Sequence, residues 1–231
     1  MFGHKYQGRQ RRLNPKSFIL KGDICFSIDK DTIVTYKNHF LVCIDGVSAG
    51  VFETLPQKYV TFEVFDYSGM LIIPGLVDLH IHAPQYTFRG LGMDDELLDW
   101  LNNHAFPEEG KYSDTAYARE AYLSFAEAME ASATTRACIF GTVHVPATLI
   151  LMDLMEKTGL RTFVGKVNMD RNAPDYLVEK NSTQSADDTV AWLEACTGGY
   201  ENVSPIVTPR FIPTCSDELM QNLHVIQQKY A

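Results

Sequence analysis

The stretch PGLVDLHIHAPQY, from Pro74 to Tyr86, decides how the rest of the chain is interpreted. It reads as a strand that ends in two histidines separated by one residue. Because side chains i and i+2 lie on the same face of a strand, His80 and His82 point the same way. Two imidazoles on one face provide a first pair of metal ligands. The alternative interpretation is two polar residues where the strand meets solvent.

The composition is that of an ordinary globular protein and excludes some partners. The 231 residues are 45% hydrophobic and 21% charged, with a net charge of −9. The acidic balance argues against nucleic acid, because phosphate backbones require a basic face. No run approaches about 18 consecutive apolar residues, so we expect no membrane span and no membrane partner.

The cysteines indicate a reducing compartment. The chain has five, an odd number, and none of them forms a CxxC pair. This usage predicts a cytoplasmic protein in which cysteine acts as a small apolar residue. It argues against a thiolate zinc site, and the absence of a PCxxC run excludes the zinc site of the cytidine-deaminase type.

The chain divides into three regions by pattern. Residues 1–16 hold five basic residues and no acid, which predicts a disordered tail. A transit peptide or an RNA-binding arm is the alternative, although the serine enrichment of a transit peptide is absent. Residues 17–73 are rich in β-branched and aromatic residues between turn signals, which predicts a small β-rich domain, a sandwich or a meander.

From residue 74 onward, strand patterns alternate with helix patterns. The expected strands are 75–82, 134–141, 160–170 and 204–211, and the expected helices follow near 95–103, 113–131, 146–159, 185–198 and 216–231. We expect Ser113 to cap the second of these helices, and a Ser185-x-x-Asp188 box to start the fourth. Pro146 opens the third helix and Gly159 ends it.

This alternation predicts an α/β fold with a parallel sheet. A doubly wound open sheet normally has a glycine-rich turn after its first strand, but HIHAPQY stands here instead. Histidines at the carboxyl end of a strand are typical of the active sites of (β/α)8 enzymes. We therefore predict a partial (β/α)8 TIM-type barrel of about four βα units in residues 74–231, preceded by the β-rich domain.

Four segments in order resemble the metal-dependent amidohydrolases, and among these the guanine deaminases. They are PGLVDLHIHAPQY, LDWLNNHAFPEE, FVGKVNMDRNAPDY and PIVTPRF, and the resemblance extends from residue 17 to the end. It implies a zinc-dependent enzyme that hydrolyses guanine to xanthine and ammonia in purine catabolism. In such chemistry zinc lowers the pKa of water to about 7, and a carboxylate moves the proton to the leaving ammonia.

The resemblance also implies roles for individual residues. His80 and His82 resemble the first two zinc ligands. Gln85 resembles the side chain that hydrogen-bonds the purine, and an amide offers both a donor and an acceptor. Arg210 and Phe211 resemble a pair that contacts the base, through a fork of N–H donors and through ring packing. The alternatives are a loop cap for Gln85, a salt bridge for Arg210 and a core position for Phe211.

Other polar residues receive structural or peripheral interpretations. We expect Lys166 to be a buried ion-pair partner and not a carboxylated metal bridge. His144 is a candidate for indirect contact with the site, whereas His104 and His224 are expected at the surface. Asp170, Arg171 and Asp175 follow the third strand and are candidates for shaping the pocket.

The resemblance places the remaining machinery on later strands. A histidine and the catalytic glutamate belong to the fifth strand, another histidine to the sixth and an aspartate to the eighth, and this sequence ends after the fourth unit. No catalytic residue is therefore assigned. Open strand edges predict a homodimer or another edge-mediated association. The alternative functions are a non-catalytic or partner-dependent fragment, and a related aminohydrolase that acts on another heterocycle.

Overall fold

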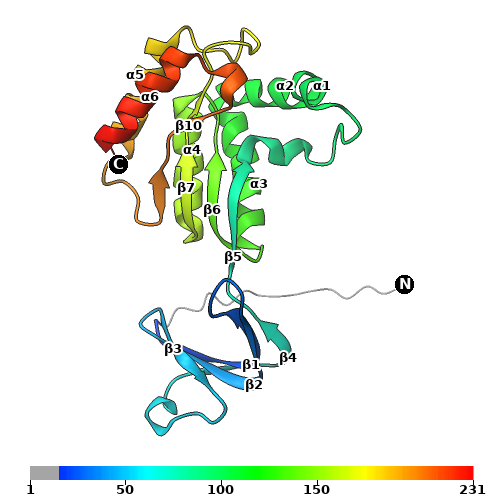
Figure 1. Cartoon of the computed structure of the whole chain (residues 1–231), viewed down its shortest axis with the longest axis vertical. Helices are drawn as coiled ribbons and strands as arrows, with labels where there is room; N and C mark the ends of the chain where they lie inside the picture. Colours follow the sequence, from blue (N-terminus) through cyan, green and yellow to red (C-terminus); the bar gives the residue numbers. More distant parts are fainter. Residues whose placement is uncertain (1–15, 231) are drawn as a thin grey trace. The chain divides into compact units, whose positions relative to one another are not determined.

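The computed structural model describes residues 16–230 and divides into two compact units, one ending at Pro74 and one beginning at Gly75. Each unit has its own sheet (Figure 1). The predicted disordered tail covers residues 1–16, and all of it except Lys16 lies outside the described residues.

The N-terminal unit is a four-stranded sheet in the order β3-β2-β1-β4. Its strands are β1 (Phe18–Ser27), β2 (Ile33–Ile44), β3 (Val47–Phe52) and β4 (Val64–Ile72). The tight hairpin between β2 and β3 turns at Asp45 and Gly46, whose φ angles of 50° and 80° suit a type I′ turn. A simple meander is wrong for this unit, because β4 pairs with β1 in parallel.

The C-terminal unit contains a parallel sheet in the order β5-β6-β7-β9. The strands are β5 (Leu76–His82), β6 (Thr134–Phe140), β7 (Arg161–Gly165) and β9 (Val203–Pro205), and the long helices are α3 (Thr115–Glu130), α4 (Val145–Thr158), α5 (Ser182–Cys196) and α6 (Asp217–Tyr230). Each strand but the last is followed by a helix that returns the chain, as Figure 1 shows. The predicted mixed α/β fold is confirmed, and closure into a barrel stays a prediction.

Two predicted strands are interrupted. The third ends at Gly165, and a separate strand β8 (Val167–Asn168) pairs with β10 (Thr208–Pro209) in a second small sheet. The interruption occurs because the backbone partners change: Ile206 N–H donates to the Val164 carbonyl, whereas Val167 N–H donates to Thr142. The segment that ends in Arg210 is therefore held by β8 and not by the main sheet.

The helices cover one face of the parallel sheet and share one core with it. An apolar stripe on α3, formed by Ala118, Tyr122, Phe125 and Met129 at helical spacing, is buried, with Tyr122 fully enclosed. Outward-facing strand residues such as Ile139 and Val164 are also fully buried in this core. Their burial gives the sheet a fixed inner and outer face, because neighbouring side chains alternate. The core members from the helices include Phe125, Met129, Leu151, Met155, Trp192, Leu219 and Leu223.

Two helix starts differ from prediction. Asp114 caps α3 by accepting from Ala116 N–H, while Ser113 donates to the Gly110 carbonyl. Asn181 caps α5 by accepting from Gln184 N–H. Ser185 lies one turn inside this helix and is fully buried. In each case another residue of similar N-cap preference stands close to the predicted serine, and the sequence pattern alone does not choose between them.

The inner face of the sheet is open in the described part of the chain. Leu79 and Phe163 are 78% and 52% exposed and line a hollow together with Cys138. Within the described residues, β5 and β9 each pair on one side only. Exposed apolar side chains and free edges of this kind favour association with further strands.

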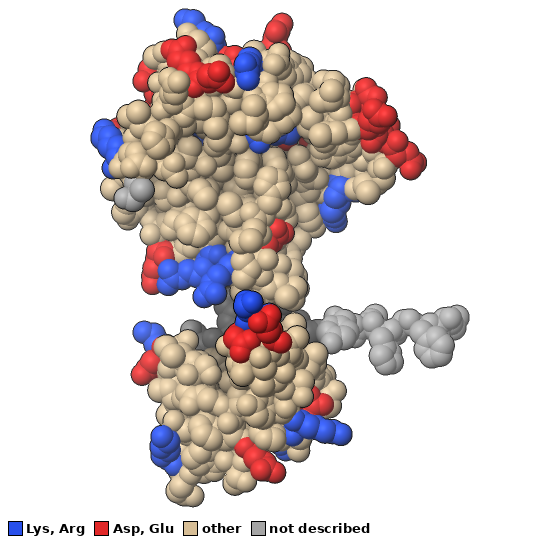
Figure 2. All heavy atoms as spheres, in the orientation of Figure 1, with Lys and Arg blue, Asp and Glu red and all other residues tan. Residues whose placement is uncertain are grey.

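The surface carries little further information on partners. On the face in Figure 2, lysines and arginines stand in small groups beside acidic side chains. None of the described helices is long and apolar enough to cross a membrane. The cysteines at 25, 43, 138, 196 and 215 are all free thiols.

Candidate active site

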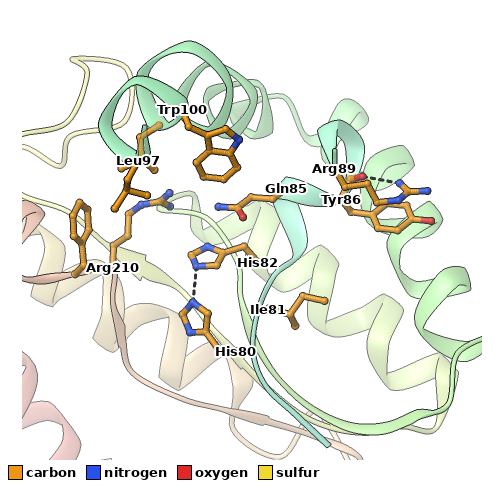
Figure 3. A pocket seen from close by; sticks show the side chains of 11 residues that line it. His80, Ile81, His82, Gln85, Tyr86, Arg89, Leu97, Trp100 and Arg210 are labelled. Atoms are coloured by element: carbon orange, nitrogen blue, oxygen red, sulfur yellow. Dashed lines mark hydrogen bonds between the residues drawn. The ribbon is translucent and has the colours of Figure 1, made fainter. Parts of the chain in front are cut away.

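Two histidines project from the carboxyl end of β5 into one cavity, as the alternation of the strand predicts (Figure 3). The Nε2 atoms of His80 and His82 lie 3.2 Å apart. The ring of Phe140, from the neighbouring strand β6, packs against both imidazoles with centroid distances of 4.7 Å. This packing holds the two rings so that their nitrogens converge.

The geometry of this pair fits a shared metal ion. Two nitrogens bound to one tetrahedral zinc at about 2.0–2.1 Å lie about 3.3 Å apart, close to the separation of His80 and His82. The same distance suits a hydrogen bond between two neutral rings, dashed in Figure 3. Burial, with smaller contributions from Arg210 and His80, lowers the pKa of His82 to about 3. His82 therefore stays neutral at physiological pH, in the form that binds a metal.

Among the described residues, His80 and His82 are the two side chains of this cavity that could serve as metal ligands. No group of three or more histidine, cysteine, aspartate or glutamate side chains is placed to hold an ion in this part of the chain. A structural or catalytic zinc site takes at least three protein ligands. The pair alone therefore falls short of the ligand set that a zinc site requires.

The cavity around the pair has a volume of about 610 Å³, large enough for a small heterocycle. Figure 3 shows Gln85 and Arg210 reaching toward each other from opposite walls, above the two imidazoles. Gln85 comes from the 3-10 turn Ala83–Phe88 that follows β5, and Arg210 directly follows β10. The other lining residues are Ile81, Tyr86, Arg89, Leu97, Trp100, Leu101 and Phe211.

All five predicted site residues line this one cavity: His80, His82, Gln85, Arg210 and Phe211. Their roles toward metal and base stay predictions. None of the described residues that line the cavity carries a carboxylate. This wall therefore offers hydrogen bonds, ring packing and two imidazoles, but no group that moves a proton in the manner of a catalytic glutamate.

Arg210 combines a cavity position with a buried ion pair. Its Nη1 lies 2.5 Å from Oε2 of Glu109, and the two side chains are 4% and 1% exposed. The guanidinium also stacks over the ring of Phe106 at 5.3 Å. The salt-bridge alternative for Arg210 is therefore correct together with its place in the cavity, because the five donors of a guanidinium allow both.

The upper wall comes from a segment that sequence reasoning did not assign to the site. It runs through α1 (Leu97–Trp100), a π-helical turn (Leu101–Ala105) and α2 (Phe106–Gly110), and replaces the single helix predicted near 95–103. Trp100 lines the cavity and donates its indole N–H to the Leu91 carbonyl. The segment LDWLNNHAFPEE resembles the family as a whole, but nothing in its residue spacing predicts a position for Trp100 or Glu109 at the site.

The remaining candidates lie outside the cavity. Lys166 forms the expected buried ion pair, with Glu179. His144 is half-buried at the start of α4 and lines a different, smaller hollow. His104 pairs with Asp95 at 3.1 Å.

Two of the residues after the third strand bind the chain that follows Arg210. Asp170 accepts from the backbone N–H of Ser216, and Arg171 donates to the Ile212 carbonyl. Asp175 is exposed. These contacts hold the segment that carries Phe211 without reaching the cavity themselves.

Comparison with known proteins gives a consistent family. Residues 71–227 match the model described as the Amidohydrolase family. Guanine deaminase of Dictyostelium discoideum is 42% identical over 220 residues, covering 87% of this chain and 49% of that protein. Guanine deaminase of Escherichia coli K12 is 40% identical over 173 residues, covering 74% of this chain and 38% of that protein.

Solved structures agree with this. Guanine deaminase from C. acetobutylicum, crystallised with guanine in its active site, superposes with a TM-score of 0.87 at 42% identity, covering 93% of this chain and 51% of that chain. Triazine hydrolase superposes with a TM-score of 0.73 at 16% identity and shows a shared fold alone. The chain spans about half the length of the relatives it matches.

Proposed function

Because the chain belongs to the amidohydrolase family, we propose that it supplies the base-binding wall and the first two zinc ligands of an enzyme that deaminates guanine to xanthine and ammonia. The observation that carries this proposal is the convergence of two imidazole nitrogens, 3.2 Å apart, below Gln85 and Arg210 in one cavity. The similarity to guanine deaminases over most of the chain supports guanine as the substrate.

Recognition of the base falls to three side chains. The Arg210 guanidinium donates to a ring nitrogen or carbonyl oxygen, and the Gln85 amide pairs with a neighbouring donor or acceptor. The ring of Phe211, which is half-buried at the mouth of the cavity, packs on the heterocycle. Together they fix the plane and the orientation of the purine above the imidazoles.

The imidazole pair holds zinc in this proposal. When bound, zinc lowers the pKa of water to about 7 and so makes hydroxide available near neutral pH. His80 and His82 contribute neutral nitrogens on one side of the ion, and Phe140 keeps both rings in place. The described residues provide no proton-shuttling carboxylate in the cavity, so this chain's part is to bind and orient.

We further propose that residues 74–231 are the first four βα units of a (β/α)8 barrel, with residues 17–73 as a separate small β-rich domain. The parallel order β5-β6-β7-β9, the helices on one face and the open inner face support this. In such a barrel the remaining ligands and the catalytic glutamate come from later strands. Either a longer polypeptide or another chain provides them.

The test uses the full chain, purified without chelator, with zinc content, guanine binding and xanthine formation measured on one sample. Because two ligands hold zinc only weakly, we expect weak zinc binding in titrations with added zinc. It should be lost in His80→Ala and retained in the matched control His224→Ala, whose side chain is exposed on α6. We also expect the parent chain to bind guanine and Gln85→Ala to lose that binding. A folded chain that binds neither zinc nor guanine contradicts the proposal.

A second candidate, a partner-dependent fragment, is favoured by the two-ligand site and the half-paired strands β5 and β9. It predicts self-association or capture of a chain that carries the later strands. Light scattering distinguishes the cases, because a monodisperse monomer with cooperative unfolding removes the need for a partner. The expected homodimer is tested by the same measurement.

A further inference from the structure

The most completely buried carboxylate near the cavity belongs to Glu109, on α2, which does not line the cavity. Glu109 is 1% exposed, and its Oε2 accepts from Arg210 Nη1 at 2.5 Å. Phe106 stands one helical turn earlier and stacks under the same guanidinium. One short helix thus holds Arg210 by charge and by ring contact, across 101 residues of sequence.

Gln85, the second polar group of the cavity, lies near enough to Glu109 to affect the pKa of that carboxylate. Burial raises the pKa of Glu109, while Arg210 and then Gln85 act in the opposite direction by favouring the ionised form. Its other oxygen, Oε1, is buried and has no hydrogen-bond partner at normal distance among the described residues. A Gln85 amide turned toward Oε1 would satisfy that oxygen, and buried acceptors are rarely left unpaired.

A carboxylate accepts hydrogen bonds and does not donate them when ionised. If Glu109 forms a hydrogen bond with Gln85, its carboxylate accepts from the amide NH₂ group. The Gln85 carbonyl oxygen then faces the cavity as an acceptor. Arg210 has donors only, and those not used by Glu109 face the cavity as well. The wall therefore presents a fixed order: an acceptor from Gln85 beside donors from Arg210.

We infer that Glu109 is a positioning residue that sets the polarity of this wall, and that the wall selects heterocycles with a lactam edge, in which a ring N–H stands beside a carbonyl. Guanine and hypoxanthine have this edge. Adenine has an amino group beside an unprotonated ring nitrogen, the opposite order, so it pairs with this wall only when turned over, with another edge toward the imidazoles. This inference rests on the proposed function, because it assigns a recognition rule to the same cavity.

Glu108 provides a matched control. It is the preceding residue on α2, is also buried, and pairs with Lys111, Thr87 and Tyr117 instead of Arg210. Binding is followed by fluorescence of Trp100, which lines the cavity. The chain has two tryptophans, and the other, Trp192, is fully buried in the helix core. Trp100→Phe therefore identifies the signal.

The experiment titrates the full chain, Glu109→Gln and Glu108→Gln with guanine, hypoxanthine and adenine. We expect Glu109→Gln to weaken the binding of guanine and hypoxanthine by at least about tenfold and to change the affinity for adenine by less than about twofold. We expect Glu108→Gln to keep the affinity for each of the three purines within about twofold of the parent value. Equal weakening of the three purines in Glu109→Gln indicates a merely structural role and overturns the inference, as does unchanged guanine affinity. If Glu109→Gln fails to fold, Glu109→Asp, which keeps the buried charge but withdraws the carboxylate from Arg210 by one methylene, decides by the same criterion.

A parent chain that binds no purine contradicts the proposed function, and the positioning claim is then judged separately. NMR signals of the Arg210 guanidinium, assigned with Arg210→Lys, report whether the group is held. We expect slowly exchanging signals in the parent and in Glu108→Gln, and their loss in Glu109→Gln. Signals that persist in Glu109→Gln overturn the positioning role whatever the ligand.

Discussion

Replacement of Lys166 by methionine tests the energetics of the best-buried lysine in the described chain. Lys166 has no exposed surface, and its ammonium donates to the carboxylate of Glu179, which is 7% exposed. Removing one partner of a buried ion pair typically costs about 3–5 kcal/mol, because the other charge is left uncompensated. Glu179 keeps two donors, Met169 N–H at 2.8 Å and Ser185 Oγ at 2.6 Å.

These remaining donors place the expected loss for Lys166→Met near the lower end, about 3 kcal/mol. For a unit of this size, each kcal/mol lowers the melting temperature by about 2–4 °C, so we expect a decrease of about 6–12 °C. The double variant Lys166→Met/Glu179→Gln removes both charges with similar volumes. It should recover to within about 1 kcal/mol of the parent.

The assay is thermal and urea unfolding followed by the fluorescence of Trp192, which reports on the C-terminal unit. The two single variants and the double variant form a mutant cycle with the parent. A double variant as unstable as Lys166→Met, or a single variant within about 1 kcal/mol of the parent, would refute the assignment of an ion pair at this position.

Three further predictions follow from burial and close packing. Burial lowers the pKa of His144, so the unfolded chain binds a proton that the folded chain does not. The free energy of unfolding should therefore fall as the pH drops below about 6.5, and it should fall less in His144→Asn. Urea titrations at two pH values measure both effects. Gly165→Ala should lower the free energy of unfolding by about 1–3 kcal/mol, because a Cβ there overlaps a threonine side chain and approaches a carbonyl oxygen to 2.6 Å. In the control Gly199→Ala the nearest atom to the new Cβ lies at 3.6 Å, so the loss measured in the same titrations should be smaller. Leu151→Ala should lose about 2–5 kcal/mol in urea unfolding, against little change for Leu123→Ala, which is 45% exposed.

The parts of the fold that follow from local chemistry were predictable. The two-residue period of β5 puts His80 and His82 on one face, and Gly159 ends α4 with a left-handed φ of 73°. The apolar stripe of α3 is buried as its spacing predicts. Each of these features depends on residues within two turns of one another, and so the sequence pattern carries them.

The parts that depend on distant partners were not predictable. The strand expected over 160–170 breaks because Val167 bonds to Thr142, far away in sequence. Glu109 is important near the cavity only because Arg210 arrives beside it from another sheet. The local sequence around either residue does not predict that the other lies beside it. The cavity residues were instead found through family resemblance, which transmits long-range information that spacing lacks.

The pairing of β5 with β6 has a consequence for inherited variation. The ladder joins Ile81 to Ile139 and His82 to Phe140, after irregular steps earlier in the strand. A shift by one residue would turn His80 and His82 toward the helices and bring Ile81 to the cavity. A single codon gained or lost within β5 should therefore remove both imidazoles from the cavity, whereas a substitution that keeps the register should leave them in place.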